Sequence, residues 1–376
     1  MNFTPLCDFI DSLIDYGIPA ADVIVQRDHE TLCRHRAGWR DREAGLPLTG
    51  DELYFMYSCS KPITVTAAMQ LYERGLFLLD DPVYEYLPEF RDVTVRRPDG
   101  TVSKAEKPML VRHLFSMTAG LNYDLHTPAL EAARAETQGR CPTRRMVAAL
   151  AKAPLDFEPG ERWQYSLCHD VLAALVEVIS GQRFADYVKA HIFDPLGMTR
   201  SAYHRPADSD ADFAAQYRYS DDRRVAERIA LKAEHVLGPD YDSGGAGVVS
   251  CVADYARFVD AMACGGVGAT GEVILSPAAI DLMRENQLGP VQMKDFNWPQ
   301  LAGYGYGLGV RTVIDRAAGG VMSPIGEFGW GGAAGAYVMI DPANRLSVFY
   351  AQHMLNNKEP YVHPRIRNIT YACLAR

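Results

Sequence analysis

A serine and a lysine three residues apart, Ser58 and Lys61, form the pair in this chain with the clearest potential for chemistry. A serine hydroxyl is a weak nucleophile near neutral pH unless a base removes its proton. On a helix that starts at Ser58, the two residues share one face, and a lysine whose pKa is lowered by burial can act as the base. The same residues also suit an ordinary helix start, with Ser58 as the N-cap and Pro62 in the first turn. The motif by itself leaves both interpretations open.

A tyrosine on a loop is the second candidate. Tyr165 follows the turn sequence Pro159-Gly160 and precedes an apolar helical segment that begins near Asp170. From such a loop its phenol can project into a cleft, where a neighbouring lysine ammonium would lower the pKa of its hydroxyl. An isolated tyrosine could equally pack at the start of that helix.

A glycine-rich segment, residues 326–335, precedes the expected strand Ala336–Ile340. Glycine allows a substrate to lie against the backbone and leaves N–H groups available as donors. Together with the N–H of Ser58, such an edge could hold a developing oxyanion, where each donor contributes about 3–4 kcal/mol. A glycine-rich bulge or turn is the structural alternative.

The order of these three elements resembles the serine β-lactamase and penicillin-binding-protein superfamily, and the resemblance covers nearly the whole chain. Further stretches look like landmarks of its class C-like branch: His113-Leu114-Phe115, Pro195-Leu196-Gly197-Met198, Ser243–Ser250 and Tyr304–Gly309.

The resemblance implies acyl transfer in two steps. Ser58 would attack an ester carbonyl while its proton passes to a Lys61–Tyr165 pair, and the N–H groups of Ser58 and Ala333 would hold the oxyanion. Tyr165 would then relay the proton to the leaving alkoxide, and water would hydrolyse the acyl-enzyme. Because Lys61 and Tyr165 should titrate together, the identity of the base stays open.

Three departures from the superfamily pattern matter. Its Tyr-x-Asn motif reads Tyr165-Ser166-Leu167, and its Lys-Thr-Gly motif reads Trp330-Gly331-Gly332. Both changes resemble the family VIII carboxylesterases, and Trp330, Gly331 and Gly332 are then expected to bind substrate. An indole in place of an ammonium removes a charge partner for an anion and adds apolar area, which favours small to medium uncharged esters. The third departure, Ser116–Gly120, has no functional explanation.

Other functions on this fold stay open: a β-lactamase, a D-aminopeptidase or amidase, or a catalytically silent binding relative. The last is disfavoured because Ser58, Lys61 and Tyr165 are all present. No serine has glycine at both −2 and +2, so the nucleophile elbow of the α/β-hydrolases is missing.

The composition of the chain limits the kinds of partner that we expect the protein to bind. The chain of 376 residues is 48% hydrophobic and 23% charged, as in ordinary globular proteins, and its formal charge of −9 argues against nucleic acid or an anionic membrane as partner. The ten histidines and eight cysteines do not cluster, and nucleotide-binding motifs are missing, so we expect no metal and no cofactor. The start has no signal-peptide pattern and no apolar run reaches membrane-spanning length, so a cytoplasmic location is expected. The oligomeric state stays open.

Patterning predicts an α/β (α+β) fold in which an antiparallel sheet is flanked by helices and joined to a mostly helical second domain. Strands are expected near both ends of the chain and helices in the middle. We expect residues 1–61 and 241–376 to form a discontinuous α/β domain and residues 62–240 a mainly helical one, with a mobile loop excursion near 201–238. The main elements expected are helices at Leu6–Tyr16, Ser60–Leu78 and Val171–Ile179, and strands at Asp22–Asp28, Thr31–Ala37, Val310–Ile314, Ala336–Ile340 and Ser347–Ala351.

Overall fold

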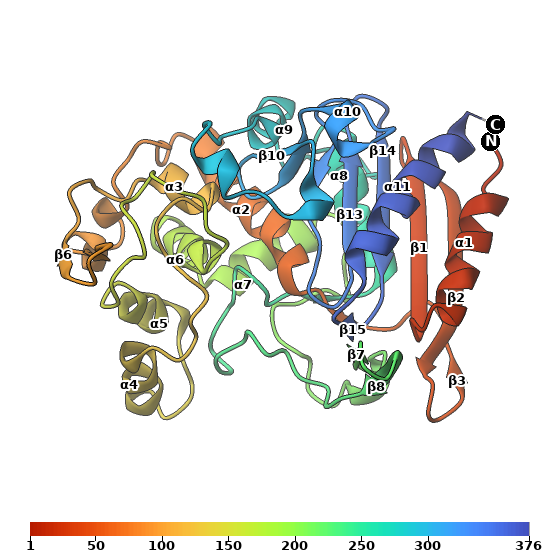
Figure 1. Ribbon diagram of the computed structural model, residues 1–376, viewed down its shortest axis with the longest axis horizontal. Coiled ribbons are helices and arrows are strands. Elements are labelled where there is room, and N and C mark those ends of the chain that lie inside the picture. Colours follow the sequence, from red (N-terminus) through yellow and green to blue (C-terminus); the bar gives the residue numbers. More distant parts are fainter. Residues whose placement is uncertain (376) are drawn as a thin grey trace.

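The two ends of the chain meet in one antiparallel sheet. The structure is a computed structural model that describes residues 1–375. Eight strands follow the order β10-β11-β12-β13-β14-β1-β2-β3 (Figure 1). Their bounds are β1 Ala20–Arg27, β2 Glu30–Asp41, β3 Leu46–Pro47, β10 Tyr304–Tyr306, β11 Arg311–Val313, β12 Phe328–Gly329, β13 Tyr337–Asp341 and β14 Leu346–Ala351. The central pair is β1 and β14, with Ile24 opposite Phe349.

Helices cover both faces of this sheet, so its central strands are buried on both sides. Strand β14 has no exposed residue, and alternate side chains enter different cores. Phe349 packs with helix α8, Val252–Ala263, whereas Val348 and Tyr350 pack toward α1, Thr4–Asp15, and α11, Glu359–Leu374.

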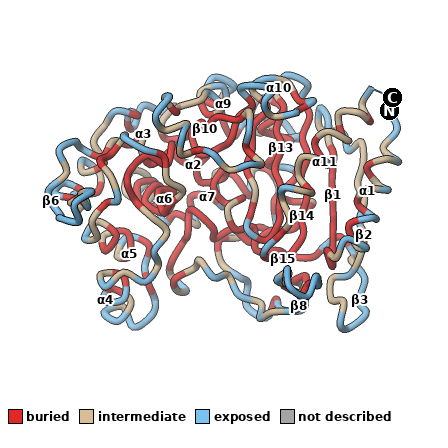
Figure 2. The backbone as a smooth tube through the Cα atoms, viewed as in Figure 1, coloured by how far each residue is buried: buried red, intermediate tan, exposed pale blue. Residues whose placement is uncertain are grey.

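The middle of the chain is mostly helical and packs around α2, Ser60–Glu73. Residues 60–71 of this helix are all buried, and α2 lies against α6, Cys168–Ser180 (Figure 2). The other helices here are α3 Val111–Phe115, α4 Pro128–Glu136, α5 Thr143–Leu150 and α7 Phe184–Val188, and α9 Pro277–Arg284 and α10 Arg316–Gly319 come later. Short pairs are β4 Tyr54–Phe55 with β9 Val249–Ser250, and β5 Thr94–Arg96 with β6 Val102–Lys104.

The expected fold class is confirmed: an antiparallel sheet with flanking helices adjoins a helical region. The helix expected over Ser60–Leu78 is shorter than predicted, since it ends at Glu73 and the chain turns at Gly75 with φ +71°. The division at residues 61 and 241 stays a prediction. Among the described residues, no helix combines the length and the apolar character needed to cross a bilayer.

The predicted excursion near 201–238 contains regular structure that its weak periodicity did not indicate. Strands β7, Tyr217–Ser220, and β8, Val225–Arg228, form a hairpin, and β7 also pairs in parallel with β15, Met354–Leu355. Tyr217 and Ala226 anchor the hairpin because both are buried.

Candidate active site

Ser58 lies in a single 3-10 turn, Tyr57–Cys59, that leads directly into α2. The residue before it, Tyr57, is buried and has φ +46°, a left-handed conformation that costs a non-glycine residue about 1–3 kcal/mol. The Tyr57 hydroxyl accepts a hydrogen bond from Gln216 Nε2 at 2.6 Å, which helps to hold this ring. The nucleophile candidate therefore sits on a strained turn that the surrounding fold holds in place.

Lys61, in the first turn of α2, is fully buried and reaches Ser58 as the sequence predicts. Its Nζ lies 3.1 Å from Ser58 Oγ, 3.3 Å from the Tyr123 hydroxyl and 2.8 Å from the carbonyl oxygen of Gly245. Burial lowers the pKa of Lys61 to about 7. The amine is therefore available as a base near neutral pH.

A buried carboxyl group acts on this lysine. Asp170 belongs to α6, and its Oδ1 accepts hydrogen bonds from the Tyr241 hydroxyl at 2.9 Å and from Ser243 Oγ at 2.7 Å. Burial raises the pKa of Asp170, and its charge in turn opposes the lowering of the Lys61 pKa. Asp170 thus helps to set the pH range in which Lys61 is neutral.

Tyr165 lies among aromatic rings beside Lys61. Its ring centroid is 4.5 Å from Lys61 Nζ, and its hydroxyl accepts a hydrogen bond from Trp330 Nε1 at 3.1 Å. Burial raises the pKa of Tyr165, and hydrogen bonds with Ser58 and Trp330 only partly oppose this. The expected fall in the Tyr165 pKa beside Lys61 was therefore wrong, because removal of the phenolate from water outweighs the stabilisation by these two hydrogen bonds.

The glycine-rich segment approaches the Ser58 turn closely. A Cβ on Gly332 would lie 2.5 Å from the Met56 carbonyl oxygen, so any residue other than glycine would require the backbone to move. The Asn357 side-chain amide donates to the carbonyl oxygens of Gly332 and Ala333, at 3.1 and 3.0 Å. The Ala333 N–H has no hydrogen-bond partner among residues 1–375.

Two cavities flank Ser58, and Ser58, Tyr165 and Ala333 line both. The first, here called the tryptophan cavity, has a volume of about 260 Å³. The second, here called the histidine cavity, has a volume of about 280 Å³. The tryptophan cavity includes Trp298, Trp330, Gly331, Gly332, Arg311 and Glu359, and the histidine cavity includes Tyr57, Tyr123, His235 and Ala246.

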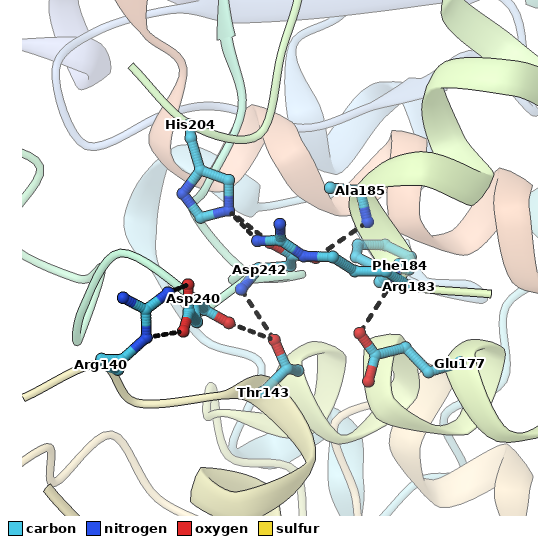
Figure 3. Close-up of polar contacts among 9 residues, drawn as sticks. All are labelled: Arg140, Thr143, Glu177, Arg183, Phe184, Ala185, His204, Asp240 and Asp242. Atoms are coloured by element: carbon cyan, nitrogen blue, oxygen red, sulfur yellow. Dashed lines mark hydrogen bonds and ion pairs between the residues drawn. The ribbon is translucent and has the colours of Figure 1, made fainter. Parts of the chain in front are cut away.

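The segment that carries the Gly245 carbonyl is anchored by a buried carboxylate three residues earlier. Asp242 binds Arg183 through two hydrogen bonds of 2.6 and 2.9 Å, accepts from Ala185 N at 3.0 Å and also binds His204 (Figure 3). Although burial alone would raise the pKa of Asp242, the bonds from His204 and Arg183 hold it below its usual value. This anchor ties residues 242–245 to α7.

The structure thus brings together all the residues that the sequence singled out: Ser58, Lys61, Tyr165, Trp330, Gly331, Gly332 and Ala333. Sequence reasoning missed Tyr123, Asp170, His235 and Asn357, which have no motif of their own. Gly245 lies inside a stretch recognised as a landmark, Ser243–Ser250, so a signal for it existed.

Comparisons with known proteins identify the family and the fold. The family described as Beta-lactamase matches residues 7–372. The chain is 33% identical to Esterase EstB of Burkholderia gladioli, over 90% of this chain and 87% of that protein. It is 31% identical to Protein Rv1367c of Mycobacterium tuberculosis, over 91% of this chain and 87% of that protein.

Among solved structures, EstCE1 is described as a hydrolase with promiscuous acyltransferase activity. It superposes with a TM-score of 0.80 at 27% identity and covers 98% of each chain. These matches confirm the resemblance seen in the sequence. Since they extend over nearly its whole length, the chain belongs to the beta-lactamase family and to the esterase-like branch of that superfamily.

Proposed function

We propose that this protein is a serine carboxylesterase that cleaves small to medium uncharged esters through an acyl-enzyme on Ser58. The observation that carries the proposal is the 3.1 Å contact between Lys61 Nζ and Ser58 Oγ, because it pairs a nucleophile with an amine whose pKa burial lowers to about 7. The names of EstB and EstCE1, an esterase and a hydrolase, support the reaction class.

In the proposed reaction, Ser58 Oγ attacks the ester carbonyl as its proton passes to the Lys61–Tyr165 pair. The oxyanion that forms accepts hydrogen bonds from the N–H groups of Ser58 and Ala333. Tyr165 delivers a proton to the alkoxide as the carbon–oxygen bond breaks, and the alcohol leaves. Water then attacks the acyl carbon as the Lys61–Tyr165 pair takes one of its protons. The bond from that carbon to Ser58 Oγ breaks, the pair passes the proton from water to Ser58, and the carboxylic acid leaves.

The tryptophan cavity supports a preference for uncharged substrates. The indole of Trp330 stands where the superfamily has the ammonium of its Lys-Thr-Gly motif. Arg311 also lines this cavity, but its charge is paired. Its Nη1 donates to Glu327 Oε1 at 2.8 Å, and its Nη2 donates to the Val338 carbonyl oxygen at 3.2 Å. Because its charge is paired, Arg311 offers little to the carboxylate of a β-lactam.

The test compares a 4-nitrophenyl butanoate assay with a chromogenic cephalosporin assay, each on the wild-type protein and on Ser58→Ala. We expect ester hydrolysis that the substitution abolishes, and slow or undetectable cephalosporin turnover. Faster cephalosporin hydrolysis would favour a β-lactamase. A fluorophosphonate probe should label the wild-type protein and not Ser58→Ala, and lack of labelling in both would favour a silent binding relative.

A further inference from the structure

A ring that lines the histidine cavity carries a buried polar atom without a partner. The His235 ring lines the cavity beside Ser58 and lies edge-on to the rings of Tyr57 and Tyr123, with centroids 5.8 and 5.5 Å away. Its Nδ1 is buried and has no hydrogen-bond partner among the residues that the structure describes. Buried polar groups are rarely left unpaired, so this atom, on a ring that lines a substrate cavity, is a candidate to bond a ligand there.

The hydroxyl groups on the same wall are already engaged. Tyr57 donates to the Lys232 carbonyl at 3.2 Å and accepts from Gln216. The Tyr123 hydroxyl lies 3.3 Å from Lys61 Nζ. His235 is therefore the side chain of this wall best placed to bond a ligand that enters the cavity.

The His235 ring is suited to an uncharged partner. Burial, together with the nearby Lys61 charge, lowers the pKa of His235 below its ordinary value, so the ring is neutral at pH 7 and above. A neutral imidazole offers one donor and one acceptor. An alcohol hydroxyl, which can also donate and accept, matches it, and the surrounding tyrosine rings fit a short carbon chain.

The acyl arm of an ester is the part that fits the histidine cavity. Ser58 and Ala333 line both cavities, so the scissile carbonyl lies where the two meet, with one arm of the ester in each. The alcohol must leave and water must enter, and the tryptophan cavity, with the Glu359 carboxylate and the Gln300 amide in its wall, is the better path for polar molecules. The acyl arm, which stays attached to Ser58, then occupies the aromatic histidine cavity.

We propose that His235 is a specificity-determining residue that hydrogen-bonds a hydroxyl group on the acyl arm, so that the enzyme prefers esters of short hydroxy acids. This inference rests on the proposed esterase function. A site that hydrogen-bonds a substrate hydroxyl rejects an analogue lacking it, because its own polar atom is then left unpaired.

The test uses two esters of the same shape, 4-nitrophenyl 3-hydroxybutanoate, as each enantiomer, and 4-nitrophenyl 3-methylbutanoate. The wild-type protein should favour one hydroxy enantiomer by about tenfold or more in kcat/KM. His235→Phe keeps an aromatic ring without a hydrogen bond and should lose most of that preference, because kcat/KM for the hydroxy ester falls more than kcat/KM for the methyl ester. His235→Asn, which keeps a donor and an acceptor, should retain part of the preference.

Equal kcat/KM for the two esters in the wild-type protein, or an unchanged ratio in His235→Phe, would overturn the inference and leave the esterase function standing. If neither ester shows turnover that depends on Ser58, both proposals fall together. Should His235→Phe not fold, His235→Ala takes its place with the same pair of esters.

Discussion

The indole N–H of Trp330 donates a hydrogen bond of 3.1 Å to the hydroxyl oxygen of Tyr165, and the two rings stack with centroids 5.6 Å apart. A bond donated to a phenol oxygen favours its anionic form and opposes the rise in the Tyr165 pKa that burial causes. The residue that replaces the motif lysine therefore contacts both the substrate cavity and the proposed proton relay.

Trp330→Phe should keep the stacking and lose this bond. We expect kcat for 4-nitrophenyl butanoate to fall about tenfold, with a smaller change in KM, since one hydrogen bond to a group that becomes charged is removed. Trp298→Phe is the matched control, because Trp298 packs against the same tyrosine ring at 5.4 Å without a hydrogen bond to its hydroxyl. Equal losses of kcat in the two variants would contradict the role given to the indole N–H.

The pH dependence of activity should follow Lys61. Burial lowers its pKa to about 7, and the protonated amine cannot accept the serine proton, so kcat/KM should rise as the pH passes through about 7 and then level off. A pH–rate profile with 4-nitrophenyl butanoate between pH 5 and pH 9 measures this limb. A rate that stays constant across this range would exclude Lys61 as the base.

Asp170→Asn should move the rise of kcat/KM with pH to lower pH. The Asp170 charge raises the Lys61 pKa against the effect of burial, so removing the charge leaves burial less opposed. The amide can still accept from Tyr241 and Ser243 through its oxygen. The same pH–rate profile checks the shift, and a limb displaced to higher pH would contradict it.

Burial of Lys61 should also lower the stability of the folded protein, by an amount that depends on pH. Its folded pKa of about 7 lies below the ordinary value of 10.5, so the unfolded chain binds more protons. The destabilisation is greatest below about pH 7 and fades as the pH approaches 10.5. Relative to the wild-type protein, the Tm of Lys61→Met should therefore be higher at pH 6.5 than it is, relative to the wild-type protein, at pH 9.5. Thermal unfolding at both pH values measures it, and a constant difference would refute it.

The buried Asp242 carboxylate should contribute more to the stability of the fold than the neighbouring ion pair between Asp240 and Arg140. Asp242→Ala leaves the Ala185 N–H and the partly exposed Arg183 without their acceptor and should lower the unfolding free energy by about 1–3 kcal/mol. Because it also loosens the segment that holds Gly245 against Lys61, esterase activity should fall as well. Asp240→Ala breaks the more exposed pair with Arg140, also drawn in Figure 3, and should cost about 0–1 kcal/mol. Denaturant unfolding compares the two, and similar losses would argue against an anchoring role.

The sequence by itself determined the elements that depend on neighbours along the chain. The spacing of Ser58 and Lys61 places them together because one helical turn separates them, and the alternation in β13 and β14 predicts a buried hairpin. The motif order, including Trp330-Gly331-Gly332, was enough to recognise the superfamily and its esterase-like branch.

Only the tertiary structure decided what depends on contacts between distant segments. Tyr123, Asp170 and Gly245 meet around Lys61 from three separate parts of the chain, and no local pattern indicates that Tyr123 or Asp170 lies there. The direction of the Tyr165 pKa shift was wrong in the sequence analysis because it depends on how many rings exclude water, which spacing does not reveal. His235 likewise became a candidate only when the fold placed its ring in the cavity beside Ser58. A helical turn is set by local geometry, whereas a cavity is set by which remote side chains pack together.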